Sequence, residues 1–276
     1  MKTEKSNNVT ITLNPDRVFA PLLNILGQSS KNVLFGLQLI DSVDDIKEPL
    51  EIQSEDTFFT FHFTDPNAKQ DIAISKDNFK LWTFQKGFED LIKGINLTLI
   101  EAYFFVKIIA RRNDLKTFGD LQNEIIEMRK TALEQSLPGL LTKVKSGLTG
   151  DLTYEKQVTS LNKVRNCLVH RNGIVTPKDI NDKVANQLRA EYSRMKVYAD
   201  KDGQETEVKK FTIVEGGSSI KMKIVNESID FNLGDRVLFD YQQFNSLLTT
   251  CYLFGLDLVQ KLPKIEIETK NEKNKK

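Results

Sequence analysis

The chain has little of several residue types that often mark a function. Its 276 residues include two cysteines, two histidines and one tryptophan. Two cysteines exclude both a disulfide framework and a zinc site built on cysteine pairs. An excess of one charge is also missing, because 39 basic residues stand against 38 acidic ones. Non-specific binding to nucleic acid over the whole surface is therefore excluded, and any RNA or DNA must be bound by a local patch.

Long hydrophobic runs are missing as well. The first ten residues, MKTEKSNNVT, contain no apolar core of a signal peptide. The most apolar run, residues 95–110, is interrupted by Glu101 and Lys107 and is shorter than a membrane span. We therefore predict a cytoplasmic protein in a reducing environment, without contact to a membrane.

Apolar residues at three- and four-residue spacing predict a mainly helical fold. The predicted helices are 32–43, 78–112, 118–137, 152–170, 178–199 and 240–262. Residues 138–150, which contain three glycines, are predicted to form a loop. We see no internal repeat.

Alternating apolar residues predict a few strands. These are residues 9–13, broken by Asn14-Pro15-Asp16, and residues 57–63 paired with 71–75. A β-hairpin is predicted at 208–225, turned at Gly216-Gly217. The predicted organisation is a strand-containing α/β segment over 1–78, a helical domain with the inserted hairpin over 79–262, and a disordered tail over 263–276.

One polar motif lies in the helix predicted to end at His170, within LNKVRNCLVHRNGIV (161–175). At about 100° per residue, Asn166 and His170 share one polar arc of this helix. The opposite, apolar arc consists of Val158, Leu161, Val164 and Leu168. Arg165 projects from that apolar arc, so it must reach solvent, pair with an acid or line a cleft.

On a straight helix, Arg165 and His170 would diverge by about 140°. Two arrangements would bring them together. Asn172-Gly173 is typical of a left-handed helix end and Pro177 follows, so His170 would sit at the last turn. Alternatively, two copies of the chain would meet across a symmetry axis. A histidine at this position is also a common dipole-stabilising cap.

The three polar residues have the chemistry for cleaving a phosphodiester. Histidine exchanges protons near neutral pH, and arginine supplies a permanent forked cation for phosphate. RNA carries its own nucleophile in the 2′-hydroxyl, so neither a metal nor another cofactor is required. A Cys167–His170 dyad is conceivable but has no obvious oxyanion hole. Glu101 is either the buried partner that orients Arg165 or an exposed residue.

The motif RNCLVH followed by RNGIV resembles the Arg-(polar)-x3-His signature of the HEPN superfamily. The order of long helices around it is similar as well, over roughly residues 79–262. The resemblance implies an all-α bundle and a metal-independent endoribonuclease, often a toxin or a phage-defence or stress effector. It also implies a homodimer in which two motifs face one another, and leaves room for an antitoxin protein as partner.

The resemblance implies a role for each motif residue. Arg165 would stabilise the pentavalent phosphate, Asn166 would help position it, and His170 would transfer the proton. The neighbouring Lys163, Arg171 and Asn172 are predicted to bind the RNA substrate. The alternative is a catalytically inactive HEPN-like module that binds a protein or RNA, in which the motif only stabilises a helix end or a dimer seam.

Overall fold

The computed structural model describes residues 13–44 and 71–264, except 112–113, 115–116, 210–211 and 215. This part of the chain is mainly helical, with a three-stranded antiparallel sheet inserted after the fifth helix, as predicted in outline. The helices are α1 (Pro15–Ser42), α2 (Ile72–Arg111), α3 (Phe118–Leu133), α4 (Leu137–Lys145), α5 (Glu155–His170) and α6 (Tyr241–Gln260). The strands are β1 (Gln187–Lys201), β2 (Gln204–Glu207) and β3 (Ser219–Asn232).

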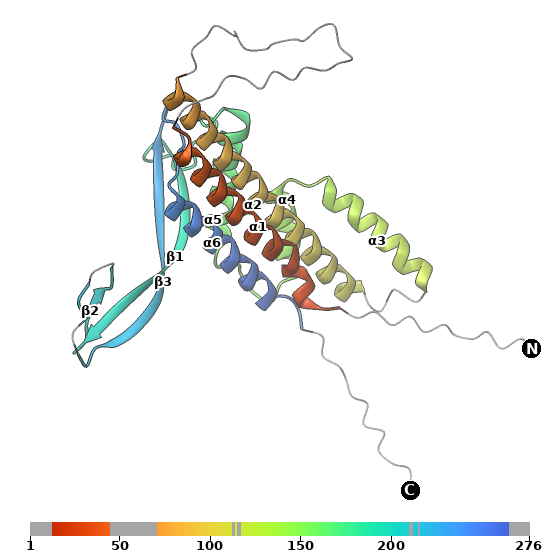
Figure 1. Ribbon diagram of the computed structural model, residues 1–276. Helices are drawn as coiled ribbons and strands as arrows, with labels where there is room; N and C mark the ends of the chain where they lie inside the picture. Colours follow the sequence, from red (N-terminus) through yellow and green to blue (C-terminus); the bar gives the residue numbers. More distant parts are fainter. Residues whose placement is uncertain are drawn as a thin grey trace, which may run out of the picture.

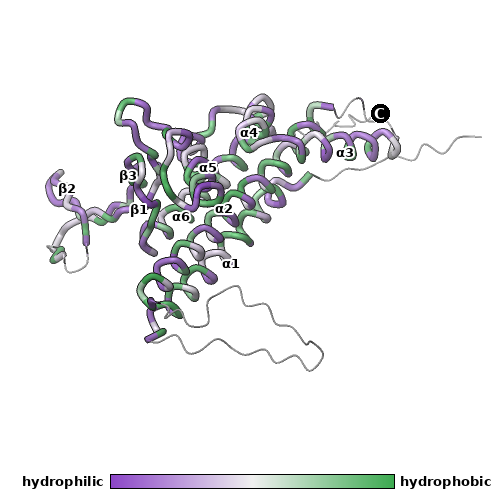
Figure 2. Tube along the Cα trace, turned by 90° about the horizontal axis from the view of Figure 1, so that it is seen from above, coloured by the Kyte–Doolittle hydropathy of each residue, from purple (hydrophilic) through white to green (hydrophobic). Residues whose placement is uncertain are grey.

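The 40-residue helix α2 is the centre of the bundle. It is about 60 Å long at 1.5 Å per residue and contacts each of the other five described helices. Figures 1 and 2 show the sheet along one side of the bundle and α3 on the opposite side. The outer half of the sheet, with β2, projects away from the helices as an arm (Figure 1).

The N-terminal part of the bundle differs from the prediction. The predicted helix 32–43 is the end of a longer helix, which begins where a break was expected. Asn14 caps this helix, because its Oδ1 accepts the Asp16 N–H at 2.9 Å, and Pro15 tolerates the first helical position because it needs no N–H partner. The predicted strand 71–75 is wrong, since it is the first turn of α2. Residues 9–12 and 57–63 lie outside the described residues, as does most of the predicted tail.

The predicted loop at 138–150 contains a helix. The preceding helix α3 starts with a capping box. The Asp120 carboxylate accepts the Thr117 backbone N–H at 2.9 Å, and the Thr117 hydroxyl accepts the Asp120 backbone N–H at 3.1 Å. It ends at Leu133, earlier than predicted. Pro138 was expected to close it, but it lies in the first turn of α4, after the N-cap Ser136. Proline suits a helix start as well as it follows a helix end, so the sequence signal was ambiguous.

The prediction of a helix at 178–199 is also wrong, because residues 187–201 form β1. Leu188, Ala190 and Tyr192 are buried at a two-residue period, while Arg189 and Glu191 alternate with them. The strand pairing predicted for the hairpin at 208–225 is wrong as well. The second strand, β3, pairs with β1 over its whole length instead of with residues 208–214, and the sheet order is β2-β1-β3.

Helices α1, α2 and α6 share one hydrophobic core, so the predicted division at residue 78 falls within α2. Glycines allow the close approach of these helices. A Cβ on Gly94 of α2 would lie 2.9 Å from Leu22 of α1, and one on Gly87 would lie 2.7 Å from the Phe244 ring of α6. Phe88 is completely buried beside Phe239, with ring centroids 5.0 Å apart. This core fixes α2, and α5 packs against it.

Candidate functional site at the end of the fifth helix

Helix α5 ends at His170, as the sequence predicts. The backbone N–H groups of Arg171 and Gly173 both donate to the Cys167 carbonyl, at 3.0 and 3.2 Å. Asn172 and Gly173 have φ angles of 54° and 71°. These positive values turn the chain sharply after the last helical residue, which leaves the His170 side chain exposed at the helix end.

Arg165, Asn166 and His170 come together within one chain. Nη1 of Arg165 lies 3.2 Å from Asn166 Oδ1 and 3.4 Å from His170 Nε2. The long arginine side chain thus spans the angle that separates the two positions on the helix. Because a guanidinium only donates, Arg165 is the donor in this contact and His170 Nε2 the acceptor.

The guanidinium of Arg165 is only partly satisfied. Its Nε is buried and has no hydrogen-bond acceptor among the described residues. Within the same part of the chain, no carboxylate lies at ion-pair distance from Arg165, whose two partners are a neutral amide and an imidazole. A half-buried cation with unused donors is suited to binding an anion, because burial without a counter-charge is unfavourable.

The carboxylate with an electrostatic link to Arg165 is Glu89 of α2, rather than the predicted Glu101. Partial burial raises the pKa of Glu89, but hydrogen bonding to Lys86 and the charges of Lys86 and Arg165 outweigh it, so the pKa lies below its usual value. Glu101 lies twelve residues further along α2, about 18 Å along the helix axis. No hydrogen bond or ion pair between described residues joins it to Arg165.

The residues predicted to bind substrate have different environments. Lys163 is exposed on the polar arc that carries Asn166 and His170, and it has no ion pair within the described residues. Asn172 is exposed, in the turn after the helix. Arg171, in contrast, forms a bidentate ion pair with Asp179, with its Nε 2.6 Å from Oδ2. Its guanidinium is thereby engaged in the protein itself.

Asp179 organises the turn that follows the motif. Its side chain is completely buried and also accepts hydrogen bonds from the backbone N–H and the hydroxyl of Thr176, at 2.9 and 2.7 Å. Burial raises its pKa, but the bonds from Arg171 and Thr176 outweigh this and lower it overall. The Arg171–Asp179 pair therefore holds residues 171–179 in place behind His170.

Cys167 is not suited to act as a nucleophile with His170. Its side chain is completely buried, and burial raises the pKa of the thiol to about 12. A thiol with this pKa is almost entirely protonated near neutral pH. The other cysteine, Cys251, is also a free and completely buried thiol.

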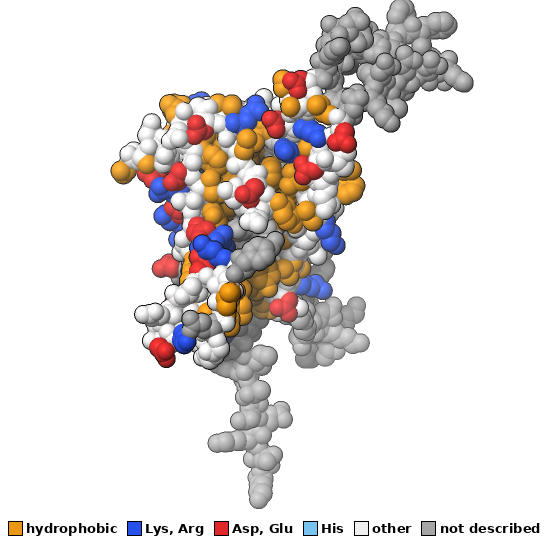
Figure 3. All heavy atoms as spheres, turned by 60° about the vertical axis from the view of Figure 1, so that its left-hand side comes forward, with side chains coloured by type: hydrophobic (Ala, Val, Ile, Leu, Met, Phe, Trp, Pro, Cys, Tyr) orange, Lys and Arg blue, Asp and Glu red, His pale blue; other side chains and the backbone are white. Residues whose placement is uncertain are grey.

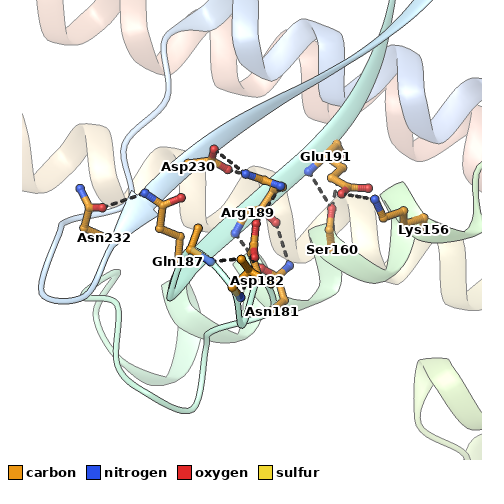
Figure 4. A network of polar contacts seen from close by, with 11 residues as sticks. Lys156, Ser160, Asn181, Asp182, Gln187, Arg189, Glu191, Asp230 and Asn232 are labelled. Carbon is orange, nitrogen blue, oxygen red and sulfur yellow. Dashed lines mark hydrogen bonds and ion pairs between the residues drawn. The ribbon is translucent and has the colours of Figure 1, made fainter.

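A groove of about 810 Å³ lies between α5 and residues 181–191. Its walls are tied together by paired charges (Figure 4). Arg189 bonds Asp182 at 2.8 Å and Asp230 at 2.7 Å, and Lys156 bonds Glu191 at 2.6 Å. These ion pairs hold the walls of the groove in place. Lys163 lines the end of the groove that is next to the polar arc of the motif.

The surface around the sheet shows no single basic face. In Figure 3, acidic and basic side chains alternate between hydrophobic ones. On this face, the distribution agrees with the nearly balanced charge of the chain.

Two important residues were missed in the sequence: Glu89 and Asp179. The Thr176-Pro-Lys-Asp179 spacing, a local turn signal, was the clue to Asp179. For Glu89 there was none, because its relation to Arg165 arises only when α2 packs against α5.

In the part of the chain that the structure describes, no three His, Cys, Asp or Glu side chains are grouped so that they could hold a metal ion. No helix there combines the length and the apolarity needed to cross a membrane. Neither family models, nor curated proteins, nor solved structures match the chain.

Proposed function

We propose that the protein is a metal-independent endoribonuclease of HEPN type that acts as a homodimer. The observation that supports this best is the contact of Arg165 Nη1 with His170 Nε2, at 3.4 Å, and no carboxylate of the described residues lies at ion-pair distance from the guanidinium. A proton acceptor and a cation with unused donors then lie side by side at an exposed helix end. This is the pair of groups that cleavage of RNA through its 2′-hydroxyl requires.

In the proposed reaction, His170 Nε2 removes the proton from the 2′-hydroxyl, and the 2′-oxygen attacks the adjacent phosphorus. The P–O5′ bond breaks, the 5′-oxygen takes up a proton, and a 2′,3′-cyclic phosphate remains. Arg165 swings from His170 to the phosphate oxygens, whose negative charge increases in the transition state. Asn166 uses its amide N–H groups to hold the same phosphate.

The glutamate of α2 has a supporting role in this proposal. Glu89 is ionised near neutral pH, since its pKa lies below the usual value. Its negative charge stabilises the Arg165 cation without occupying the guanidinium at ion-pair distance. Arg165 is therefore free to move to the substrate.

The test is cleavage of RNA by the purified full chain in the presence of EDTA, with the products analysed for 2′,3′-cyclic phosphate ends. We expect cleavage by the wild type and loss of cleavage in His170→Ala and Arg165→Ala. Lys156→Ala is the matched control. It removes an exposed cation from the same helix, 14 residues (about 21 Å) from His170.

Absence of cleavage by the wild type, or full activity of His170→Ala, would refute the proposal. Sedimentation of the wild type tests the dimer separately, and a monomer that cleaves RNA would remove that part alone. The toxin or defence role would be tested by growth arrest on expression, with His170→Ala as the inactive control, and by looking for a co-purifying antitoxin-like protein.

The second candidate is a non-catalytic interaction module, and the projecting arm favours it. Met195, Met222 and Ile224 are exposed on one face of the arm, with Met195 paired to Ile224 across β1 and β3. An exposed apolar face is typical of a protein contact. In this case Met222→Glu would abolish binding of the partner protein to the arm, whereas His170→Ala would leave that binding unchanged.

A further inference from the structure

A hollow of about 370 Å³ lies between α1 and α2. Three aromatic side chains line it: Phe35 of α1 and Phe79 and Trp82 of α2, with 61%, 43% and 51% of their surfaces exposed. The rings of Phe79 and Trp82 are stacked, with centroids 5.4 Å apart and planes at 17°. Three large aromatic residues thus stay in contact with water although burial would stabilise each of them.

Polar groups lie beside these rings. Asn32 of α1 and Lys86 and Asp90 of α2 belong to the same hollow. Flat apolar faces combined with a few hydrogen-bonding groups are the features by which proteins bind single nucleobases, through stacking and contacts to the base edges. The volume of the hollow lies in the range of about 300–1,000 Å³ that is typical of ligand sites.

Helix α2 lines the hollow with one face and packs against the end of α5 with a neighbouring face. Leu81, the neighbour of Trp82, packs beside the turn after His170, since a Cβ on Gly173 would lie 3.1 Å from its Cδ1. On the other side, Lys86 of the hollow bonds Glu89 at 2.7 Å, and Glu89 is the carboxylate that feels the charge of Arg165. The stretch of α2 from 81 to 89 therefore borders both the hollow and the motif.

We propose that this hollow binds an unstacked base of single-stranded RNA whose backbone lies across Arg165 and His170. The inference rests on the proposed endoribonuclease function and adds the substrate class: a flexible single strand, because a base held in a duplex cannot reach the rings. Trp82 and Phe79 offer the ring surface on which the base stacks, and Asn32 and Asp90 of the same hollow offer hydrogen-bonding groups to its edge. Single-stranded RNA is thus preferred over duplex RNA of the same sequence.

Trp82 is the only tryptophan of the chain, so its fluorescence reports on the hollow alone. The experiment titrates the full-length wild type with a single-stranded 2′-O-methyl oligoribonucleotide, which cannot be cleaved because its 2′-oxygen is blocked. We expect strong quenching of the emission. An abasic oligonucleotide of equal length, which offers phosphates but no bases, is the matched ligand and should quench little.

Variants then locate the effect. Phe79→Leu keeps the reporter and should weaken binding about 5- to 150-fold, the loss that corresponds to about 1–3 kcal/mol for one stacked base. Trp82→Leu, followed by the anisotropy of a labelled RNA, should weaken it by a similar factor. Leu133→Ala, which changes an exposed apolar residue of α3, is the control and should bind like the wild type.

The proposal is overturned if the emission does not change with RNA, or changes equally with the abasic strand. It is also overturned if the emission depends on protein concentration rather than on RNA, since a second copy of the chain would then fill the hollow. The two proposals remain separable. Cleavage without quenching contradicts the base site alone, and base-dependent quenching without cleavage contradicts the endoribonuclease alone.

Discussion

Two arginines six residues apart have opposite environments. Arg171 forms a bidentate ion pair with the buried carboxylate of Asp179, whereas the hydrogen-bond partners of Arg165 among the described residues are Asn166 and His170. Arg189 at the base of the sheet resembles Arg171, because Asp182 and Asp230 both bond it. Arg171 and Arg189 thus hold segments of this protein together, whereas Arg165, which has no ion pair among the described residues, is available to a ligand.

The largest expected effect is on cleavage at the unpaired site. His170→Ala should lower the cleavage rate about 10²- to 10⁴-fold, the usual contribution of a proton-transfer group. Because His170 is exposed, the free energy of unfolding should change by less than about 1 kcal/mol. Single-turnover cleavage and urea unfolding measure the two effects. A large loss of stability with little loss of cleavage would assign His170 to the helix end alone.

The next effect is on stability at the paired site. Asp179→Ala leaves the half-buried Arg171 without its partner and should lower the free energy of unfolding by about 3–5 kcal/mol. Glu89→Ala at the motif end is the matched change and should cost about 1 kcal/mol or less, because the bonded Lys86 is largely exposed. Urea unfolding compares them. Equal losses would remove the distinction between the two regions.

Acid should separate the regions in the same way. The pKa of Asp179 is lowered in the folded protein, so its contribution is present above the unfolded value of about 3.8 and is lost as the pH falls through the folded value. Stability should therefore decrease below about pH 4. Asp179→Asn should flatten this slope more than Glu89→Gln. Unfolding at a series of pH values measures the slopes, and a flatter curve for Glu89→Gln would contradict the ranking.

The smallest expected effect concerns the polar arc of α5. Lys163 has no ion pair among the described residues, and a phosphate contact there would make binding depend on salt. Lys163→Gln should weaken RNA binding a few-fold and reduce the slope of log K against log salt by about 1. Lys156→Gln should leave the slope unchanged, because Lys156 already pairs with Glu191. Unchanged slopes in both variants would place the RNA elsewhere.

Local signals predicted part of this structure correctly. The end of α5 at His170 follows from Asn172-Gly173, and α6 follows from its own apolar period. Where one signal suits two structures, the prediction was wrong. Residues 187–201 alternate charged and apolar side chains in a way that also suits a helix face, and only pairing with β3 made them a strand. Asp71, taken as part of a strand, instead accepts the N–H of Ala73 at 2.8 Å at the start of α2.

The sequence by itself determined the motif: a helix that ends at His170, with Asn166 on its polar arc and Arg165 out of place in its apolar arc. Helical period and turn residues are local properties, and they are sufficient for that. Only the tertiary structure decided that Arg165 contacts His170, that Glu89 rather than Glu101 feels its charge, and that Asp179 occupies Arg171. These relations depend on how side chains distant in the sequence are packed and desolvated together, and no local pattern encodes that.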